Sequence, residues 1–314
     1  MPLEDFPENT ASRDYDVALL KRIIANDYVA DWVPVGSAIK GHTAQFTVLK
    51  DSIKIDGVRM TTSLDLAQRV ADMLGCVLIT PRVMDLQWLQ RAVTIPFVGF
   101  VQKKGDDRFM ATKAWLIRYN AYINAQLAAA NYKGGIIGPI WKSWPLTNLL
   151  LDRRPMAINY GGYDKRNPYH CVSFVPDCRL IQQPSWAHDY RHIDYSQFFC
   201  FMRRECIVDN TVVDVTSVMQ NKDLVGLVSH EGVLRLLRAP GVPVQVPVVS
   251  NVPTPPCAGP NCPKPVIWTE ESDEKTSTDF GAVAMSGLAL AGVIGAFALG
   301  MKMMGRAHSV KKAA

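Results

Sequence analysis

An apolar run near the C-terminus constrains this 314-residue chain more than any other feature. Phe280–Met301 contains no charged residue, and a helix over this range would rise about 33 Å, enough to cross a hydrocarbon core about 30 Å thick. A buried core helix could have the same composition, but this run follows an irregular segment and precedes a basic tail, 302–314. We therefore predict a membrane protein with one C-terminal transmembrane helix at 280–301 and the lipid bilayer as a partner.

Small residues recur along the predicted membrane helix. Gly287, Ala291 and Gly295 are spaced four apart, so they form a ridge along which a second helix could approach closely. Glycine and alanine are also common in membrane helices for other reasons. The ridge is therefore a candidate surface for a homo-oligomer.

The sequence leaves open which side of the membrane holds the body. The positive-inside tendency keeps the basic tail in the cytoplasm, yet the acidic N-terminus shows no apolar region of a signal peptide. A tail-anchored protein with a cytosolic body, entry into a virion membrane during assembly, and a dedicated export route all fit this pattern.

Charge argues against binding of nucleic acid by the body. From Phe280 onward the chain has four cations and no acid, which leaves 30 Lys and Arg against 29 Asp and Glu before it. Phosphate binding needs a local excess of cations, so we expect no sequence-specific nucleic-acid binding.

The chain before the membrane segment predicts an α+β fold, with N-terminal helices and a hairpin followed by a mainly antiparallel sheet in the second half. Asp56-Gly57, between two apolar runs, marks the hairpin turn. Periodicity and capping residues predict the helices. These are 12–26, with Val17, Leu20, Ile23 and Ile24 on its stripe; one capped by Ser63 and stopped by Gly75; one opened by Thr80-Pro81; and 111–130.

The second half consists of short apolar runs between turn residues, a pattern typical of strands. One such run is TVVDVTSVM, at 211–219. Frequent prolines from 239 to 279 favour an extended spacer. We therefore predict a globular body at 1–238 and a proline-rich stalk at 239–279, followed by the membrane helix and the tail.

The seven cysteines allow two short disulfide loops. Cys171 with Cys178, and Cys257 with Cys262, have spacings that could close such loops. Cys200 and Cys206 share one predicted strand, which would hold them about 20 Å apart. A zinc ribbon is not expected, because no C-x-x-C occurs. Reduced thiols fit a cytosolic body equally well.

The stretch WAHDYRHIDYSQ (186–197) is the main candidate for chemistry. His188 and His192 are four apart, so on a helix both imidazoles would face one metal, and Asp189 follows the first as Glu does in H-E-x-x-H metalloproteases. In an extended strand, His188, His192 and Asp194 still share one face. The three residues predict a zinc site or, without metal, a His–Asp acid–base pair. Histidines and aspartates in loops also often serve only to form turns.

Three residue sets follow from this motif and its surroundings. Ser196 could act as a nucleophile beside a histidine, although no G-x-S-x-G surrounds it. A Cys171 thiolate activated by a histidine is a further possibility. The candidate catalytic set is His188, Asp189, Asp194 and Ser196; the metal set is His188, His192 and Asp194; the substrate-binding set is Tyr160, Tyr163, Asp164 and Tyr190.

Several segments together resemble a group of uncharacterised bacterial proteins. They are GHTAQFTVLKDS, VRMTTSLDLAQRVADMLGCVLITPRVMDLQW, LTNLL, INYGGY and HDYRHIDYS, and they span most of 38–238. The resemblance implies a shared fold and an ancestral site around His188 and Asp194, but no activity. Members of the group carry histidines near the positions of Ile140 and Gln197, which this chain lacks, so the resemblance also implies an altered or lost site.

Two functions fit these features. A membrane-anchored hydrolase with a His/Asp site would reach peptidoglycan from its stalk. A non-enzymatic phage virion or assembly protein would instead bind partners and oligomerise through its membrane helix.

Replacing Val293 with Arg tests the membrane anchor. A cation at the centre of the helix should cost about 2.5–3.5 kcal/mol of insertion free energy, so the variant should appear in the supernatant of carbonate-washed membranes while the wild type stays in the pellet. Val310→Arg in the basic tail is the matched control and should stay in the pellet. Release of the wild type would contradict the anchor.

Overall fold

The computed structural model describes residues 3–100, 109–138, 141–151, 155–164, 169–171 and 178–247, all within the compact unit Met1–Thr269. Its class is α+β with antiparallel sheets, as predicted. Across those ranges, no helix has both the length and the apolarity to cross a membrane. The predicted membrane helix, the basic tail and the stalk beyond 247 lie outside the described residues.

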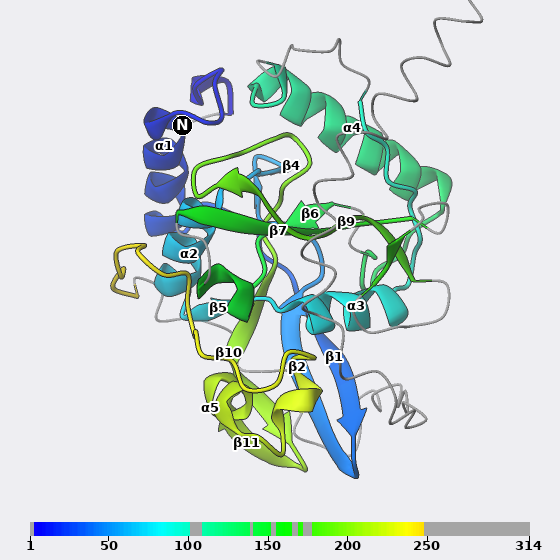
Figure 1. Ribbon diagram of the computed structural model, residues 1–314. Coiled ribbons are helices and arrows are strands. Elements are labelled where there is room, and N and C mark those ends of the chain that lie inside the picture. The colour runs from blue at the N-terminus through cyan, green and yellow to red at the C-terminus, as the bar shows by residue number, and fades with distance from the viewer. Residues whose placement is uncertain are drawn as a thin grey trace, which may run out of the picture. The chain divides into compact units, whose positions relative to one another are not determined.

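The first sheet joins strands from both ends of the body. Its order is β1-β2-β10-β11, with β5 also paired to β10, and every pair is antiparallel. The N-terminal pair β1-β2 therefore joins the late strand β10 through β2 (Figure 1), so the two halves of the body fold as one structure. Its strands are β1 (Trp32–Ile39), β2 (His42–Leu49), β5 (Cys76–Leu78), β10 (Phe201–Val208) and β11 (Thr211–Asp214).

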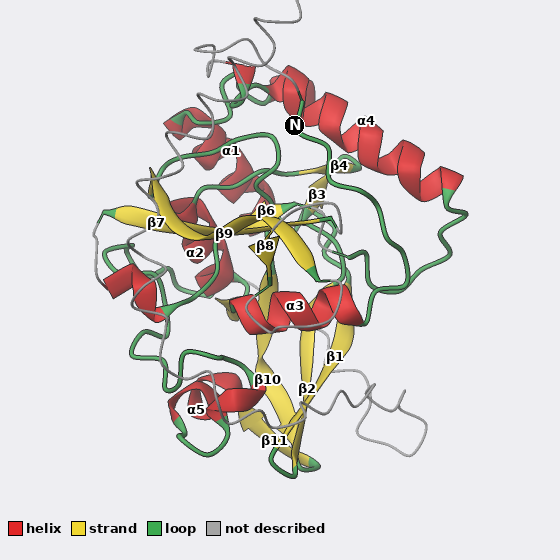
Figure 2. Cartoon of the chain, turned by 45° about the vertical axis from the view of Figure 1, so that its right-hand side comes forward, coloured by secondary structure: helices red, strands yellow, loops and turns green. Residues whose placement is uncertain are grey.

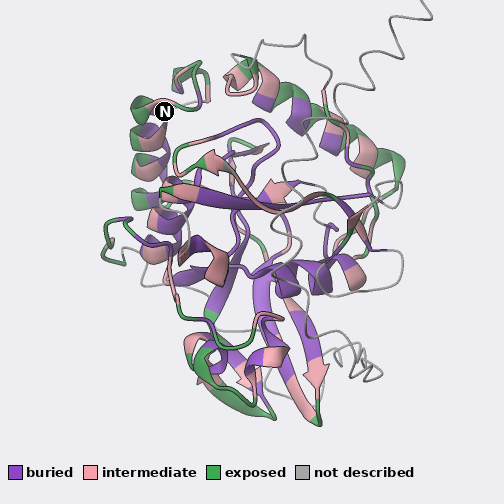
Figure 3. Ribbon diagram, in the orientation of Figure 1, coloured by how far each residue is buried: buried purple, intermediate pink, exposed green. Residues whose placement is uncertain are grey.

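The second sheet carries the candidate site. Its order is β6-β7-β9-β8, and β7 is buried from Ala157 to Tyr163 because it lies in the middle of the sheet and of the molecule (Figure 3). The register sets Ala157 opposite His188. The strands are β6 (Lys142–Ser143), β7 (Met156–Tyr163), β8 (Tyr169–His170) and β9 (Arg179–Asp189).

Two helices begin where the predicted capping residues place them, after Ser63 and after Thr80. Ser12, Ser63, Thr80 and Thr112 each accept a backbone N–H in the first turn. α1 and α4 lie on one side of the second sheet, and α3 lies on the other, in contact with β1 and β7 (Figure 2). The helices are α1 (Arg13–Ile24), α2 (Leu64–Met73), α3 (Pro81–Leu89), α4 (Lys113–Ala129) and α5 (Val215–Gln220), with 3-10 turns at Leu3–Asp5, Asn148–Leu151 and Val225–Leu227.

The predicted hairpin is confirmed. β3 (Lys54–Ile55) pairs with β4 (Val58–Arg59), and Asp56 and Gly57 at the turn have φ of 50° and 76°. Two successive positive φ angles are what a two-residue turn of type I′ requires.

The buried stripe of α1 was predicted only in part. Ile23 is buried as predicted, but Val17 and Ile24 are 49% and 59% exposed, and the other inward residues are Tyr15, Ala18, Leu19 and Arg22. Two polar side chains turn inward because they find partners there. The Tyr15 hydroxyl lies 3.0 Å from the Thr61 carbonyl, and Arg22 pairs with Asp56 at 2.8 Å.

Only the first part of the run TVVDVTSVM, which was predicted as a strand, forms one. β11 ends at Asp214, and the next residues form α5. The Asp214 carboxylate accepts the N–H of Thr216 at 2.8 Å, which caps the helix. An aspartate inside an apolar β-branched run was therefore the signal for this switch.

The folded body continues past residue 238. Ala239 and Val242 are buried, the Ala239 N–H donates to Gln68 at 2.6 Å, and Arg238 pairs with Asp72 at 2.8 Å. The first part of the predicted stalk thus lies against α2, and an extended spacer can begin only after Gln245, whose N–H donates to Asp72.

Candidate functional site

A turn brings the two histidines of the motif together. His188 lies near the end of β9, and His192 follows a turn in which the Asp189 carboxylate accepts the N–H of Arg191 at 2.7 Å. The two imidazole rings stack with centroids 3.7 Å apart and planes 13° from parallel. The histidines therefore meet by chain reversal, through neither a helix nor a continuous strand.

Trp144 forms the wall behind the histidine pair. Its ring is fully buried and makes edge contacts with both imidazoles, at centroid distances of 6.1 Å to His188 and 6.4 Å to His192. Its Nε1 donates to the Thr62 carbonyl at 2.7 Å, which fixes the ring. The rigid indole restricts the orientations of the two histidines.

His188 is held in its neutral form. Burial lowers its pKa to about 4, and the nearby His192 and Lys142 act in the same direction, while Asp194 and Asp189 oppose them. At neutral pH the imidazole is therefore unprotonated, which is the form that a general base must have before it accepts a proton.

Asp194 is a buried carboxylate with three donors. Its Oδ2 accepts the Lys142 ammonium at 2.6 Å, and its Oδ1 accepts the N–H and the hydroxyl of Ser196 at 2.7 and 2.6 Å. Burial alone would raise its pKa, but Lys142 and the hydrogen bonds outweigh it and hold the pKa far below its usual range. Nε2 of His192 lies 4.0 Å from Oδ2, too far for a direct hydrogen bond.

The histidines and Asp194 converge, but their arrangement is not that of a metal site. An imidazole binds zinc through a lone pair in its ring plane, and two stacked, nearly parallel rings cannot aim such lone pairs at one ion. Lys142 also occupies the carboxylate. Zinc would require one ring to rotate and the ammonium to withdraw.

The other predicted catalytic residues have structural partners. Asp189 is exposed and stabilises the turn, so its carboxylate does not take the position of the glutamate in H-E-x-x-H. Ser196 is buried and its hydroxyl donates to Asp194 rather than to an imidazole. Both residues therefore support the backbone around the histidine pair.

The predicted substrate-binding residues do not share one surface. Tyr160 and Tyr163 are fully buried and donate to Asp85 at 2.8 and 2.6 Å. Asp164 is also buried, and its N–H donates to the Arg179 carbonyl at 3.0 Å. Tyr190, which is half-buried in the histidine turn, is the member of this set that lies beside the site.

Sequence reasoning missed Lys142, Trp144 and Asp16. Asp16 lies on α1 and meets the histidine turn through Arg191, at 3.6 Å. Burial raises the pKa of Asp16 to about 6, although the positive charge of Arg191 acts to lower it. All three residues precede His188 by 44 or more positions along the chain, and no local pattern marks them.

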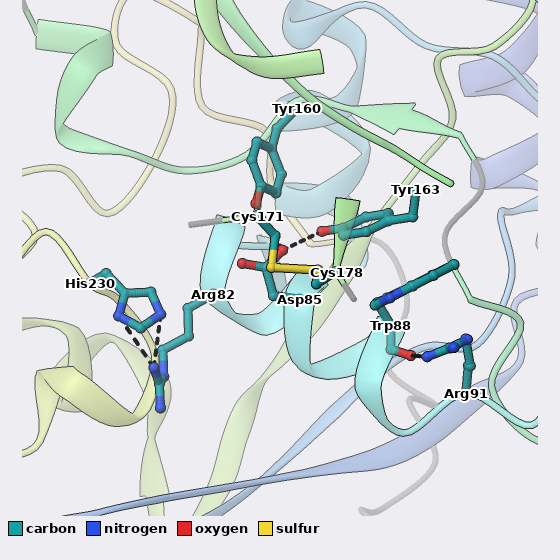
Figure 4. The surroundings of a disulfide bond; sticks show 9 residues. All are labelled: Arg82, Asp85, Trp88, Arg91, Tyr160, Tyr163, Cys171, Cys178 and His230. Atoms are coloured by element: carbon teal, nitrogen blue, oxygen red, sulfur yellow. Dashed lines mark hydrogen bonds between the residues drawn. A yellow bond between two sulfur atoms is a disulfide. The ribbon is translucent and has the colours of Figure 1, made fainter. Parts of the chain in front are cut away.

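A second cluster contains the residues of a possible metal-binding group. Among the described residues, Asp85, Cys171 and Cys178 are the group whose ligand atoms all lie within 4.8 Å of one another. Cys171 and Cys178 form a disulfide (Figure 4), one of the two short loops that the spacing allowed. The bond excludes a Cys171 thiolate nucleophile in this state. Cys257 and Cys262 lie outside the described residues.

Comparison with known proteins finds no matching family model, no matching curated protein and no matching solved structure.

Proposed function

We propose that this protein is a membrane-anchored hydrolase that acts on peptidoglycan, with His188 as its general base. The observation that carries the proposal is a half-buried imidazole, neutral at physiological pH, beside a buried carboxylate and ammonium pair. Titratable groups with strongly shifted pKa values that meet in one place are typical of catalytic sites.

Each residue has a role in a metal-free mechanism. His188 takes a proton from water, whose oxygen attacks the electrophilic carbon of an amide or glycosidic bond. The bond to the leaving group breaks, and the leaving group receives the proton from the His188 imidazolium. A pKa of about 4 favours the proton transfer from this imidazolium to the leaving group, and it also makes the neutral ring a weak base toward water. His192 and Trp144 position the ring.

Zinc offers a second form of the same proposal. Rotation of one imidazole would let His188, His192 and Asp194 bind one ion, which would lower the pKa of a bound water. The stacked rings and the Lys142 contact favour the metal-free form. Retention of activity after dialysis against a chelator would support the metal-free form, and loss restored by zinc would support the other.

The location proposed for the enzyme comes from the sequence. A single span at 280–301 would tether the body through the proline-rich segment, and pairing along Gly287, Ala291 and Gly295 would bring two bodies together. Such a tether keeps the site within reach of a cell wall beside the membrane. This is the reason for choosing peptidoglycan as substrate.

One observation favours the non-enzymatic alternative, a phage virion or assembly membrane protein. All three donors to the Asp194 carboxylate come from within the protein, and a carboxylate satisfied in this way can serve folding alone. In that case the body would bind partners, and the histidine pair would only stabilise the turn.

A peptidoglycan assay separates the two functions. The full-length protein, reconstituted in liposomes, should release soluble fragments from purified, dye-labelled peptidoglycan. His42→Ala replaces a histidine of β2 in the first sheet, whose side chain is 40% exposed and lies 2.6 Å from Asp209, and this variant should be as active as the wild type. If the folded wild type releases nothing across pH 4–9, the enzymatic proposal fails.

A further inference from the structure

The disulfide between Cys171 and Cys178 lies in a buried polar cluster that the proposed hydrolase does not use. α3 supplies Asp85 and β7 supplies Tyr160 and Tyr163, while Cys171 directly follows β8 and Cys178 directly precedes β9. Figure 4 shows the Asp85 carboxylate beside the two sulfur atoms, with the tyrosines pointing toward it.

Asp85 and both cysteines are almost completely buried. Asp85 and Cys178 are 0% exposed and Cys171 is 1% exposed. Oδ1 of Asp85 accepts both tyrosine hydroxyls, and burial together with this carboxylate raises the pKa of Tyr163 well above its usual value. Both tyrosine hydroxyls donate to this one oxygen, so they hold the Asp85 carboxyl group beside the sulfurs, where it can serve as an oxygen ligand.

We propose that reduction of the Cys171–Cys178 disulfide converts this cluster into a zinc site with Asp85, Cys171 and Cys178 as its protein ligands. Two thiolates and one carboxylate are a donor set that zinc accepts, with its fourth position open to water. The inference is independent of the proposed hydrolase, because it uses none of the residues around His188.

The redox step balances with a dithiol as reductant. The dithiol gives two electrons and two protons, its own sulfurs form a disulfide, and the Cys171–Cys178 bond becomes two thiols. Binding of Zn²⁺ then displaces both protons to solvent. Burial raises the pKa of free thiols elsewhere in the described residues, to about 12 at Cys76 and about 11 at Cys200, so a cation is needed to hold two thiolates in similarly buried surroundings.

The geometry requires only small movements. Two sulfurs bound to one zinc at about 2.3 Å lie about 3.8 Å apart in a tetrahedral site. The cysteine Cα atoms are 5.6 Å apart, and the ligand atoms of all three residues already lie within 4.8 Å of one another. Rotation of the cysteine side chains can open the bond to this spacing while the backbone bond from Cys171 N to Cys178 O, at 3.1 Å, stays in place.

Cobalt reports thiolate ligands directly and tests the proposal. The full-length protein carrying Cys257→Ser and Cys262→Ser, which removes the other closely spaced cysteines, is reduced with dithiothreitol and desalted without oxygen. Titration with Co²⁺ should give one ion per chain, a sulfur-to-cobalt charge-transfer band and the visible bands of tetrahedral cobalt. Zinc should then displace it. The oxidised protein should show none of these bands.

Matched variants assign the ligands. Cys171→Ser should abolish the charge-transfer band or weaken it strongly. Asp85→Asn should weaken cobalt binding at least tenfold. The control Cys200→Ser, at a free buried cysteine, should bind cobalt like the parent. Absence of the band in the reduced parent, or full binding by Cys171→Ser, would overturn the proposal. If Asp85→Asn fails to fold, the band of the parent and its loss in Cys171→Ser still decide. Equal binding by a folded Asp85→Asn would overturn the role of Asp85.

Discussion

Replacing His188 with alanine should lower the rate of peptidoglycan hydrolysis by about 10²–10⁴-fold, the usual contribution of a general base. The same change should alter the free energy of unfolding by only about 1 kcal/mol, because His188 is half-buried and packs mainly on His192. Dye release gives the rate, and urea unfolding followed by circular dichroism gives the stability.

The pH profile distinguishes a base from a structural histidine. The neutral imidazole is the active form, so the rate should rise with pH through about 4, the pKa of His188, and stay high at neutral pH. Added imidazole should restore part of the activity of His188→Ala, which a packing role does not predict. Parallel loss of folding and activity, without rescue, would assign the residue to stability.

The same titration also affects folding. Because the pKa of His188 is lower in the folded protein than the ordinary value of 6.5, the unfolded chain binds more protons between these values, and stability falls as pH drops through that window. His230, with a pKa lowered to about 3 by burial, acts in the same direction. Each rate must therefore be paired with a spectrum that shows a folded protein.

A fall in rate at higher pH would identify a separate proton donor. Asp16 has a pKa of about 6 and lies beside the histidine turn, so the acid form is lost as pH rises above this value. If such a limb occurs, Asp16→Asn should remove it.

Local sequence signals accounted for the boundaries of the fold but not for its pairing. Ser63, Thr80-Pro81 and Asp56-Gly57 act within a few residues of themselves, so their capping and turn chemistry is readable from the chain. The pairing of β2 with β10 joins segments about 160 residues apart, and alternation of apolar residues does not say which strand is the neighbour.

The same contrast applies to the candidate site: its members that are close in sequence were predicted, and its members from distant segments were not. His188, His192 and Asp194 stand close together in the sequence, and their chemistry drew attention to them. The turn that brings the imidazoles together is stabilised by the Asp189 carboxylate. Lys142, which donates to Asp194, comes from β6. The zinc prediction was based on neighbouring residues in the sequence, and it could not include the Lys142 ammonium that pairs with Asp194.

Arg59 illustrates a buried interaction that periodicity also cannot reveal. It lies in β4, the second strand of the predicted hairpin, where a cation would be expected to face solvent, yet its side chain is almost fully buried. Nε and Nη2 donate to the two oxygens of Asp51 at 2.7 and 2.8 Å, and Nη1 donates to Asn120 and Asn124 on α4 at 2.9 and 2.7 Å. The guanidinium therefore ties the hairpin to α4 through charged hydrogen bonds.

Replacing Arg59 with alanine should destabilise the body by about 3–5 kcal/mol, because Asp51 would keep a buried charge without its main partner. Burial alone would raise the pKa of Asp51, and Arg59 is the largest of the groups that instead hold it low. The expected fall in the thermal midpoint is about 6–20 °C for a body of this size. Scanning calorimetry on the full-length protein measures it.

Arg204→Ala is the matched control for that loss. Arg204 also bonds one aspartate through two nitrogens, at 3.0 and 2.9 Å to Asp214, but both side chains are largely exposed, so its removal should cost about 1 kcal/mol or less. Replacing both members of the buried pair, Arg59→Met with Asp51→Leu, should recover part of the lost stability, because neither position then holds a buried charge. Lys54, whose Nζ lies 2.6 Å from Asp51, is 24% exposed and keeps access to water. Equal, small effects of Arg59→Ala and Arg204→Ala would mean that water reaches Asp51 once the arginine is gone, and that burial of this ion pair contributes little to the fold.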